Sequence, residues 1–182
     1  MKLCGIDEAG RGPLAGPLVM AGVILHKRIK GLNDSKKLSE QKRERLFDEI
    51  RTQSAHHIVS FNASVIDEMG LSACLAAGLR DIMMTLGSAD YLFDGNSTFG
   101  VSGLRTMVKA DETIPEVSAA SILAKVTRDR EMVKMSELYP EYGFEGHKGY
   151  GSAAHIEAIR QYGHCDIHRK SFKLKALQPS LF

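Results

Sequence analysis

The stretch GIDEAGRG, residues 5–12, joins a short apolar run to two adjacent carboxylates and then to a Gly-Arg-Gly loop. The apolar residues 3–6 predict a buried strand, at whose end a carboxylate is unfavourable unless it is paired or bound to a metal ion. Glycines carry no side chain, so a ligand can approach the backbone of residues 10–12 closely. The stretch therefore favours acidic metal ligands beside a slot lined by backbone and one arginine, although a polar turn after an edge strand gives the same pattern.

The two carboxylates belong to Asp7 and Glu8, and side chains alternate across a strand. We therefore expect these two side chains to point to opposite faces of the sheet. Both can serve one site only if the strand ends between them, which the glycines that follow would allow.

The chain has 182 residues, 43% of them hydrophobic and 25% charged, which suffices for one domain with a substantial core. We expect a single domain over residues 1–182 that ends in a flexible tail at about 173–182. The net charge of +2 does not by itself indicate a nucleic-acid partner. Basic residues are concentrated in 26–45 and 160–175, and two basic zones around an acidic centre suit a polyanion bound over metal ions. Solvated helix faces produce similar basic runs.

The cysteines Cys4, Cys74 and Cys165 are far apart in the chain, and an odd number without metal-ligand spacing argues against a disulfide framework. Reduced thiols fit a cytoplasmic protein. The longest apolar stretch, residues 14–25, is too short to span a bilayer, and the acids before it do not fit a signal peptide. We expect a cytoplasmic protein with no membrane segment. We also expect a monomer, because no apolar stripe remains beyond those that the predicted core uses.

Hydrophobic periodicity and turn residues predict an α/β chain. Strands are expected at 1–7, 17–26, 55–62 and 90–95, and helices at 40–53, 71–86, 115–137 and 153–162. The strand at 17–26 is apolar on both faces and is expected in the middle of the sheet. Ser39 and Ser152 are expected to cap helix N-termini, and Gly87 to stop a helix.

Three short runs end in an acid, at Asp7, Asp94 and Asp111, if residues 107–111 loosely repeat the strand pattern of 90–95. Ligand sites of α/β sheets gather at such strand ends. Converging carboxylates repel one another, and a divalent cation relieves that repulsion. Oxygen ligands favour Mg²⁺ or Mn²⁺ over zinc. The pattern therefore predicts a metal site.

The predicted helix at 115–137 has an apolar stripe that includes Val126 and Val133. Two hydroxyls and two cations fall on another face of this helix: Ser118, Ser121, Lys125 and Arg128. Such a row can follow a phosphate backbone, or it can be an ordinary solvated face.

Two further features can bind a nucleic acid. Lys36 and Lys37 precede the Ser39 cap, where a phosphate is favoured, although they can also serve solubility alone. Tyr150 lies in the glycine-rich loop at 146–151, where an exposed aromatic ring can stack on a sugar or base.

Taken together, these residues resemble bacterial ribonuclease HII over nearly the whole chain. The matching blocks are DEAGRGPLAGPLV from Asp7, DSKKLS from Asp34, the strand end at Asp94-Gly95, KAD at 109–111, SAASILAKVTRD from Ser118, HKGYG from His147 and HRKSF from His168. One block would be weak, but all of them in this order make the resemblance specific.

The resemblance implies an RNase H-like catalytic domain of the α/β class: a mixed central sheet flanked by helices, with a helical C-terminal part. It implies an endoribonuclease that cleaves RNA in RNA–DNA hybrids and at single ribonucleotides embedded in duplex DNA, leaving 3′-hydroxyl and 5′-phosphate ends. Two divalent ions, Mg²⁺ or Mn²⁺, are implied during catalysis. The implied catalytic and metal-binding acids are Asp7, Glu8, Asp94 and Asp111.

The resemblance also implies how substrate is bound. Gly10, Arg11 and Gly12 would read the ribonucleotide 2′-hydroxyl largely through backbone groups, and Tyr150 would pack on the adjoining deoxyribose. The residues implied to hold phosphates are Lys36, Lys37, Ser118, Ser121 and Lys125. Since the catalytic strand starts at Met1, we expect no N-terminal substrate-binding domain of the ribonuclease HIII kind.

The main competing function is a non-catalytic protein that binds RNA–DNA hybrids or junctions on the same fold. A pure binder has no need of four acids beside phosphate, so the carboxylates favour the enzyme. The end of the tail, QPSLF at 178–182, resembles peptides that dock into bacterial sliding clamps, with Gln178, Leu181 and Phe182 as its key residues. A frayed terminus is the simpler interpretation of that tail.

Overall fold

A computed structural model describes residues 1–32 and 35–174. In this part of the chain, five strands form one sheet in the order β3-β2-β1-β4-β5. The strands are β1 Leu3–Ala9, β2 Leu18–Leu25, β3 Ser54–Phe61, β4 Asp90–Asp94 and β5 Leu104–Met107. β1 pairs antiparallel with β2 and parallel with β4, so the sheet is mixed, as expected.

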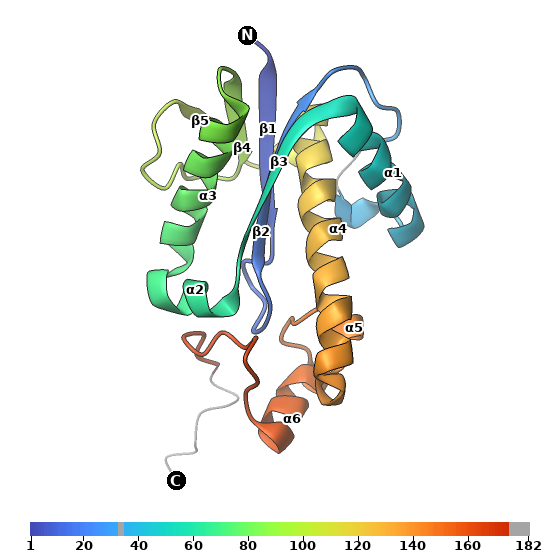
Figure 1. Ribbon diagram of the computed structural model, residues 1–182, viewed down its shortest axis with the longest axis vertical. Helices are drawn as coiled ribbons and strands as arrows, with labels where there is room; N and C mark the ends of the chain where they lie inside the picture. Colours follow the sequence, from blue (N-terminus) through green and yellow to red (C-terminus); the bar gives the residue numbers. More distant parts are fainter. Residues whose placement is uncertain (33–34, 175–182) are drawn as a thin grey trace.

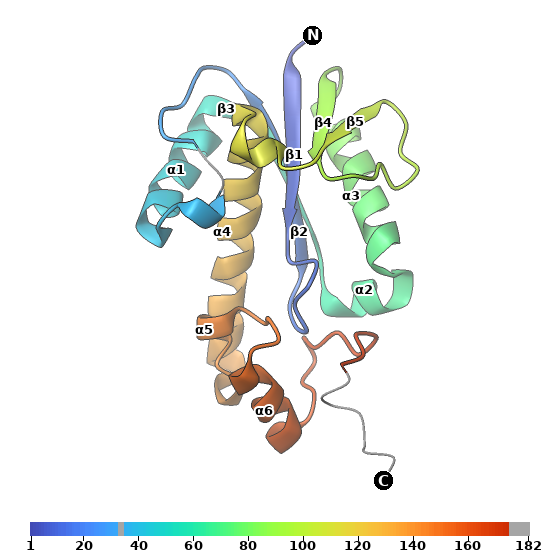
Figure 2. The same ribbon diagram turned by 180° about the vertical axis from the view of Figure 1, so that it is seen from behind.

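Helices cover both faces of this sheet (Figures 1 and 2). The α-helices are α1 Glu40–Gln53, α2 Ala63–Met69, α3 Leu71–Leu86, α4 Pro115–Leu138, α5 Phe144–His147 and α6 Ala153–Tyr162. Short 3₁₀ helices are η1 Ser35–Lys37, η2 Ala110–Glu112 and η3 Pro140–Tyr142. The expected α/β architecture with a helical C-terminal part is confirmed.

Strand β2 contributes side chains to two hydrophobic cores, one on each face of the sheet. Its residues Leu18 and Met20 pack in a cluster with α3, whereas Val19 and Ala21 pack in a second cluster with α1 and α4. Because both faces are covered, the strand is buried along almost its whole length. The predicted interior position of this strand is confirmed.

Local capping signals also match the structure. The Ser39 hydroxyl accepts the Lys42 N–H at 3.3 Å, and the Ser152 hydroxyl accepts the His155 N–H at 3.2 Å. α2 was not expected from the sequence, although Asn62 gives the signal for it by accepting the Val65 N–H at 3.0 Å.

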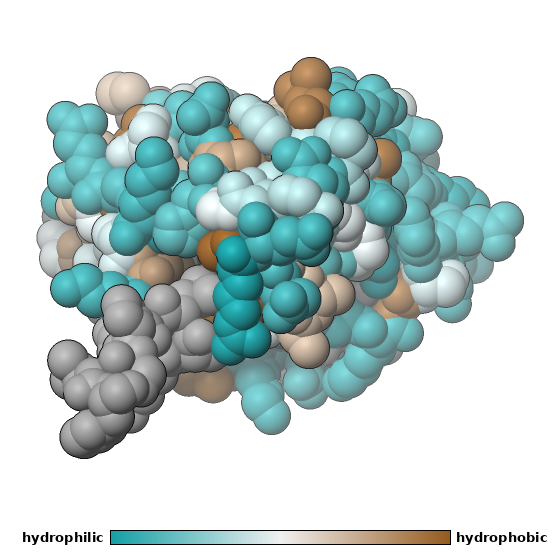
Figure 3. All heavy atoms as spheres, turned by 90° about the horizontal axis from the view of Figure 1, so that it is seen from below, coloured by the Kyte–Doolittle hydropathy of each residue, from teal (hydrophilic) through white to brown (hydrophobic). Residues whose placement is uncertain are grey.

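The C-terminal helices pack at one end of α4 (Figure 1). Met132 of α4 is buried there with Tyr142, Phe144 and Ala158. Viewed toward this end of the molecule, the described residues present a mostly hydrophilic surface, with hydrophobic residues as scattered patches (Figure 3).

Four expectations were wrong. The first strand does not end between Asp7 and Glu8, because β1 pairs with β2 as far as Ala9. Asp111 lies on η2 and not at a strand end. Val133 departs from the apolar stripe of α4, with 42% of its surface exposed. Arg169 belongs to the basic zone at 160–175 that was expected to face a polyanion or solvent, but it is buried, with 1% of its surface exposed.

Cys4 and Cys74 are buried, Cys165 is half-buried, and all three are free thiols. Within the described residues, no single helix is long and apolar enough to cross a membrane. In the same part of the chain, α2 and α3 taken together have the required length and composition, but that pair is bent by 108°.

Candidate active site

Three carboxylates from three different elements converge beside the sheet. β4 runs parallel to β1 and pairs with it as far as Ile6 and Phe93, so Asp7 and Asp94 follow at neighbouring strand positions. Asp111 approaches from η2. One oxygen of each carboxylate lies within 4.8 Å of the others, which is close enough to hold a metal ion. The predicted convergence of these three acids is confirmed.

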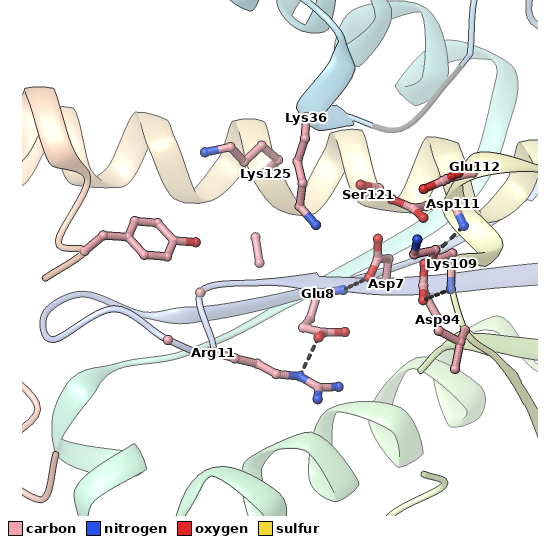
Figure 4. Close-up of a pocket in the computed structure, with 15 residues that line it drawn as sticks. Asp7, Glu8, Arg11, Lys36, Asp94, Lys109, Asp111, Glu112, Ser121 and Lys125 are labelled. Carbon is pink, nitrogen blue, oxygen red and sulfur yellow. Dashed lines mark hydrogen bonds and ion pairs between the residues drawn. The ribbon is translucent and has the colours of Figure 1, made fainter. Parts of the chain in front are cut away.

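Asp94 holds the turn that presents Asp111 (Figure 4). Its two oxygens accept the backbone N–H groups of Lys109 and Asp111, each at 3.1 Å. Lys109 adopts a left-handed backbone with φ of 58°, which reverses the chain between β5 and η2. On the other side, the Ser118 hydroxyl donates to the Asp111 carbonyl oxygen. Asp111 is therefore positioned from both β4 and α4.

Burial and like charge both act on Asp7. Its pKa is raised well above the ordinary aspartate value, chiefly because burial removes water and also because Glu8 and Asp94 repel its charge. The Glu8 N–H, which donates to Asp7 Oδ1 at 2.8 Å, offsets only part of this. A divalent cation would remove the repulsion, and oxygen donors suit a hard cation such as Mg²⁺ or Mn²⁺.

Glu8 leaves β1 on the side opposite to Asp7 and meets Arg11 (Figure 4). Its Oε1 lies 2.5 Å from Arg11 Nε, and the Arg11 guanidinium lies 5.5 Å from the centre of the Phe99 ring. Burial raises the pKa of Glu8, while Arg11 acts in the opposite direction. Both carboxylates nevertheless line one pocket, because β4 stops pairing at Ile6 and leaves the edge of β1 open beyond it.

This pocket has a volume of about 610 Å³. The predicted site residues that line it are Asp7, Glu8, Gly10, Arg11, Gly12, Lys36, Asp94, Asp111, Ser121, Lys125 and Tyr150. Val108 and Lys109 also line it and were missed as site residues, although they precede Asp111 directly in the sequence.

Three predicted binding residues have other surroundings. Lys37 Nζ lies 3.4 Å from a Glu112 carboxylate oxygen. Ser118 is 3% exposed and supports Asp111 from below the pocket surface. Arg128 was expected on a helix face that is solvated or follows phosphate. This expectation is wrong, because Arg128 is 1% exposed and donates to backbone carbonyls.

Lys125 lines the pocket, and its Nζ also lies 2.8 Å from an Asp129 carboxylate oxygen.

A mixed sheet of this topology, with clustered carboxylates at the ends of its central strands, is typical of metal-dependent nucleases of the RNase H-like superfamily. The family model described as Ribonuclease HII matches residues 4–175. The ribonuclease HII of Sulfurovum sp. (strain NBC37-1) is 64% identical over 99% of this chain and 96% of that protein. The chain belongs to the ribonuclease HII family and is an endoribonuclease, so the enzyme is favoured over the non-catalytic binder.

Solved structures agree with the fold. A ribonuclease HII from Archaeoglobus fulgidus, solved in a complex with PCNA, has a TM-score of 0.82 and 30% identity and covers 100% of this chain and 98% of its own. The ribonuclease H2 of Pyrococcus horikoshii OT3 has a TM-score of 0.76 and 31% identity, and the match covers 95% of this chain and 94% of that protein's chain. The family acts on RNA–DNA hybrids.

Proposed function

We propose that this chain cleaves RNA–DNA hybrids, and duplex DNA at single embedded ribonucleotides, by hydrolysis at Asp7, Glu8, Asp94 and Asp111. The observation that carries the proposal is the convergence of three carboxylates within 4.8 Å at the base of a pocket. Mg²⁺ or Mn²⁺ would be the cofactor, because both prefer oxygen ligands.

Two divalent ions bound by these acids would supply Lewis-acid stabilisation of the reacting phosphate and a more acidic water. Attack of water on the phosphorus breaks its bond to the 3′-oxygen on the 5′ side of the ribonucleotide. The products carry a 3′-hydroxyl and a 5′-phosphate. Asp94 contributes in a second way, because it holds the backbone of Asp111.

Recognition of the ribonucleotide would rest on Gly10, Arg11, Gly12 and Tyr150. Gly10 adopts φ of 95°, which an L side chain rarely adopts, and all four residues line the pocket. Tyr150 is 42% exposed, so its ring is available to pack on a sugar. The 2′-hydroxyl is the group that distinguishes the sugars of RNA and DNA, so backbone groups in this loop are suited to detect it.

Phosphate contacts would come from Lys36, Ser121 and Lys125, which line the same pocket. Lys36 approaches from η1 and Lys125 from α4, so the two cations lie on the α4 side of the acids (Figure 4). Lys37 is exposed and can join them on a longer duplex. Ser118 would act indirectly, through Asp111.

A sliding clamp is a second proposed partner, through Gln178, Leu181 and Phe182, which lie outside the described residues. The complex of the Archaeoglobus fulgidus relative with PCNA supports this proposal. Deleting residues 178–182 should leave cleavage intact and abolish clamp binding in surface plasmon resonance. An unchanged clamp affinity would dismiss the proposal without affecting the nuclease.

The metal-dependent reaction is tested by measuring kcat/KM on an RNA–DNA hybrid with Mg²⁺, Mn²⁺ or EDTA. We expect cleavage with either ion, none with EDTA and none for Asp7→Asn. Asp90→Asn is the matched control, since Asp90 is exposed at the opposite end of β4. Cleavage that survives EDTA, or an active Asp7→Asn protein, would refute the proposed chemistry.

A further inference from the structure

Two buried arginines lie behind the loop that joins β1 to β2. Arg128 of α4 and Arg169 of the C-terminal segment are each 1% exposed. Burial lowers the pKa of both groups, that of Arg169 to about 10, where the nearby Arg128 charge contributes as well. A buried guanidinium is unfavourable unless hydrogen bonds satisfy it. The acceptors of these hydrogen bonds therefore indicate the role of the arginines.

Arg169 binds the loop near both of its ends. Its Nη2 donates to the Gly10 carbonyl at 2.5 Å, its Nη1 to the Arg11 carbonyl at 3.0 Å and its Nε to the Gly16 carbonyl at 3.0 Å. The peptide groups on both sides of Arg11 are thereby held from one side. Their orientation determines what the loop presents to the pocket.

Arg128 joins the same loop to the turn that carries Tyr150. Its Nε donates to the Pro17 carbonyl at 2.9 Å and its Nη2 to the Ala15 carbonyl at 3.0 Å. Its Nη1 donates to the Lys148 carbonyl at 2.8 Å, and its guanidinium carbon lies 5.4 Å from the centre of the Tyr150 ring. One planar group thus holds the loop and the ring in a defined relation.

The glycines at these contacts leave space for the arrangement. A Cβ at Gly10 would lie 2.3 Å from Arg128 Nε, and a Cβ at Gly149 would lie 2.3 Å from the Ala15 carbonyl oxygen. The Leu14 N–H donates to the Gly149 carbonyl at 2.8 Å, which closes the same contact from the backbone. The loop and the turn therefore fit together through backbone and guanidinium groups.

We propose that Arg128 and Arg169 are positioning residues for recognition of the ribonucleotide: they orient the Gly10–Arg11 peptides relative to Tyr150 without touching the substrate. This inference rests on the proposed role of that loop and ring in reading the 2′-hydroxyl. Lysine cannot replace either arginine, because a single ammonium cannot reach three carbonyls in a planar fork. Arg→Lys keeps the charge and removes the geometry, so it separates the two contributions.

The test compares affinities for two DNA duplexes that differ by one 2′-hydroxyl, measured by fluorescence anisotropy with Ca²⁺ in place of Mg²⁺. The readout is the dissociation constant for the all-DNA duplex divided by that for the duplex with one ribonucleotide. A smaller folded fraction raises both constants by the same factor, so it does not change this ratio. We expect Arg128→Lys and Arg169→Lys to lower this ratio by about 2- to 10-fold, the scale of one lost hydrogen bond to the 2′-hydroxyl. Arg130→Lys is the matched control, because Arg130 is an exposed residue of α4 that pairs with Glu44.

The outcomes are distinct. Gly149→Ala leaves both arginines intact and pushes the Tyr150 turn away from the loop, so the ratio of dissociation constants should fall for this variant too. It provides an independent test if a lysine variant does not fold. A ratio that stays at the wild-type value in folded Arg128→Lys and Gly149→Ala proteins would overturn the positioning role. Equal affinities of the wild-type protein for the two duplexes would instead refute the proposed reading of the 2′-hydroxyl itself, and the positioning role with it.

Discussion

Asp94 Oδ2 accepts the backbone N–H of Asp111 at 3.1 Å. One acid of the cluster therefore sets the backbone of another. This explains how Asp111 reaches the site from a 3₁₀ turn, because the carboxylate at the end of β4 replaces the strand pairing that would otherwise align it. The acids form an assembly in which the loss of one displaces a second.

Asp94→Asn and Asp94→Ala should both reduce kcat/KM on an RNA–DNA hybrid by at least about 100-fold, the scale for loss of one strong electrostatic contact. Asp94→Ala should also lower the melting temperature more than Asp94→Asn, because an asparagine oxygen can still accept one of the two N–H groups. An active Asp94→Asn protein would contradict the assignment of the site.

Ser118→Ala should lower the free energy of unfolding by about 1–3 kcal/mol, because it removes the donor to a buried carbonyl. It should also lower kcat/KM by about 10-fold or more, since the carbonyl belongs to Asp111. Chemical denaturation and hybrid cleavage measure the two effects. Ser136→Ala on the same helix is the control, and equal behaviour of the two variants would remove the supporting role of Ser118.

Tyr150→Ala should lower cleavage at a single ribonucleotide by about 10-fold, the scale of one lost stacking contact, and at least as much as it lowers cleavage of a long hybrid. Tyr150→Phe keeps the ring and should retain most activity. The two substrates are compared by kcat/KM in parallel. A Tyr150→Ala protein with normal cleavage of both would exclude the ring from substrate recognition.

His168 should make folding stability depend on pH. Cys165 N–H donates to His168 Nδ1 at 2.9 Å, and His168 Nε2 lies 2.9 Å from His155 Nε2, so the buried pair is neutral. Burial, together with the nearby His155 and His164, lowers the pKa of His168 from 6.5 to about 4.

The unfolded chain therefore binds a proton in the window from pH 6.5 down to about 4 that the folded chain does not. Stability is fully present above this window and falls as the pH drops through it, by up to about 3 kcal/mol. Denaturation of His168→Gln should depend less steeply on pH than that of the wild-type protein, while His26→Gln, at an exposed position, should keep the wild-type slope. Equal slopes for His168→Gln and the wild-type protein would contradict a buried neutral His168.

Local signals made much of this fold predictable. Ser39, Ser152 and Gly87 act through neighbours within four residues, so the ends of their helices follow from the sequence alone. The convergence of Asp7 and Asp94 was also predictable, because acids at the ends of adjacent parallel strands must meet.

The roles of Arg128 and Arg169 were not predictable in this way. Their partners lie far away in sequence: Arg128 reaches Pro17 and Arg169 reaches Gly10, separations of 111 and 159 residues. In sequence, such arginines resemble surface cations, and only packing of α4 and the C-terminal segment on the loop shows that they are internal. Asp111 is a similar case, since its position depends on Asp94.

Metal-dependent cleavage at a single ribonucleotide can be measured with a labelled DNA duplex that contains one ribonucleotide, incubated with Mg²⁺, Mn²⁺ or EDTA. We expect a metal-dependent cut on the 5′ side of that ribonucleotide, with a 3′-hydroxyl on one product and a 5′-phosphate on the other. Failure to cut this duplex, in a preparation that degrades an all-RNA strand paired with DNA, would contradict the reading of a single 2′-hydroxyl by the Gly10–Gly12 loop and Tyr150.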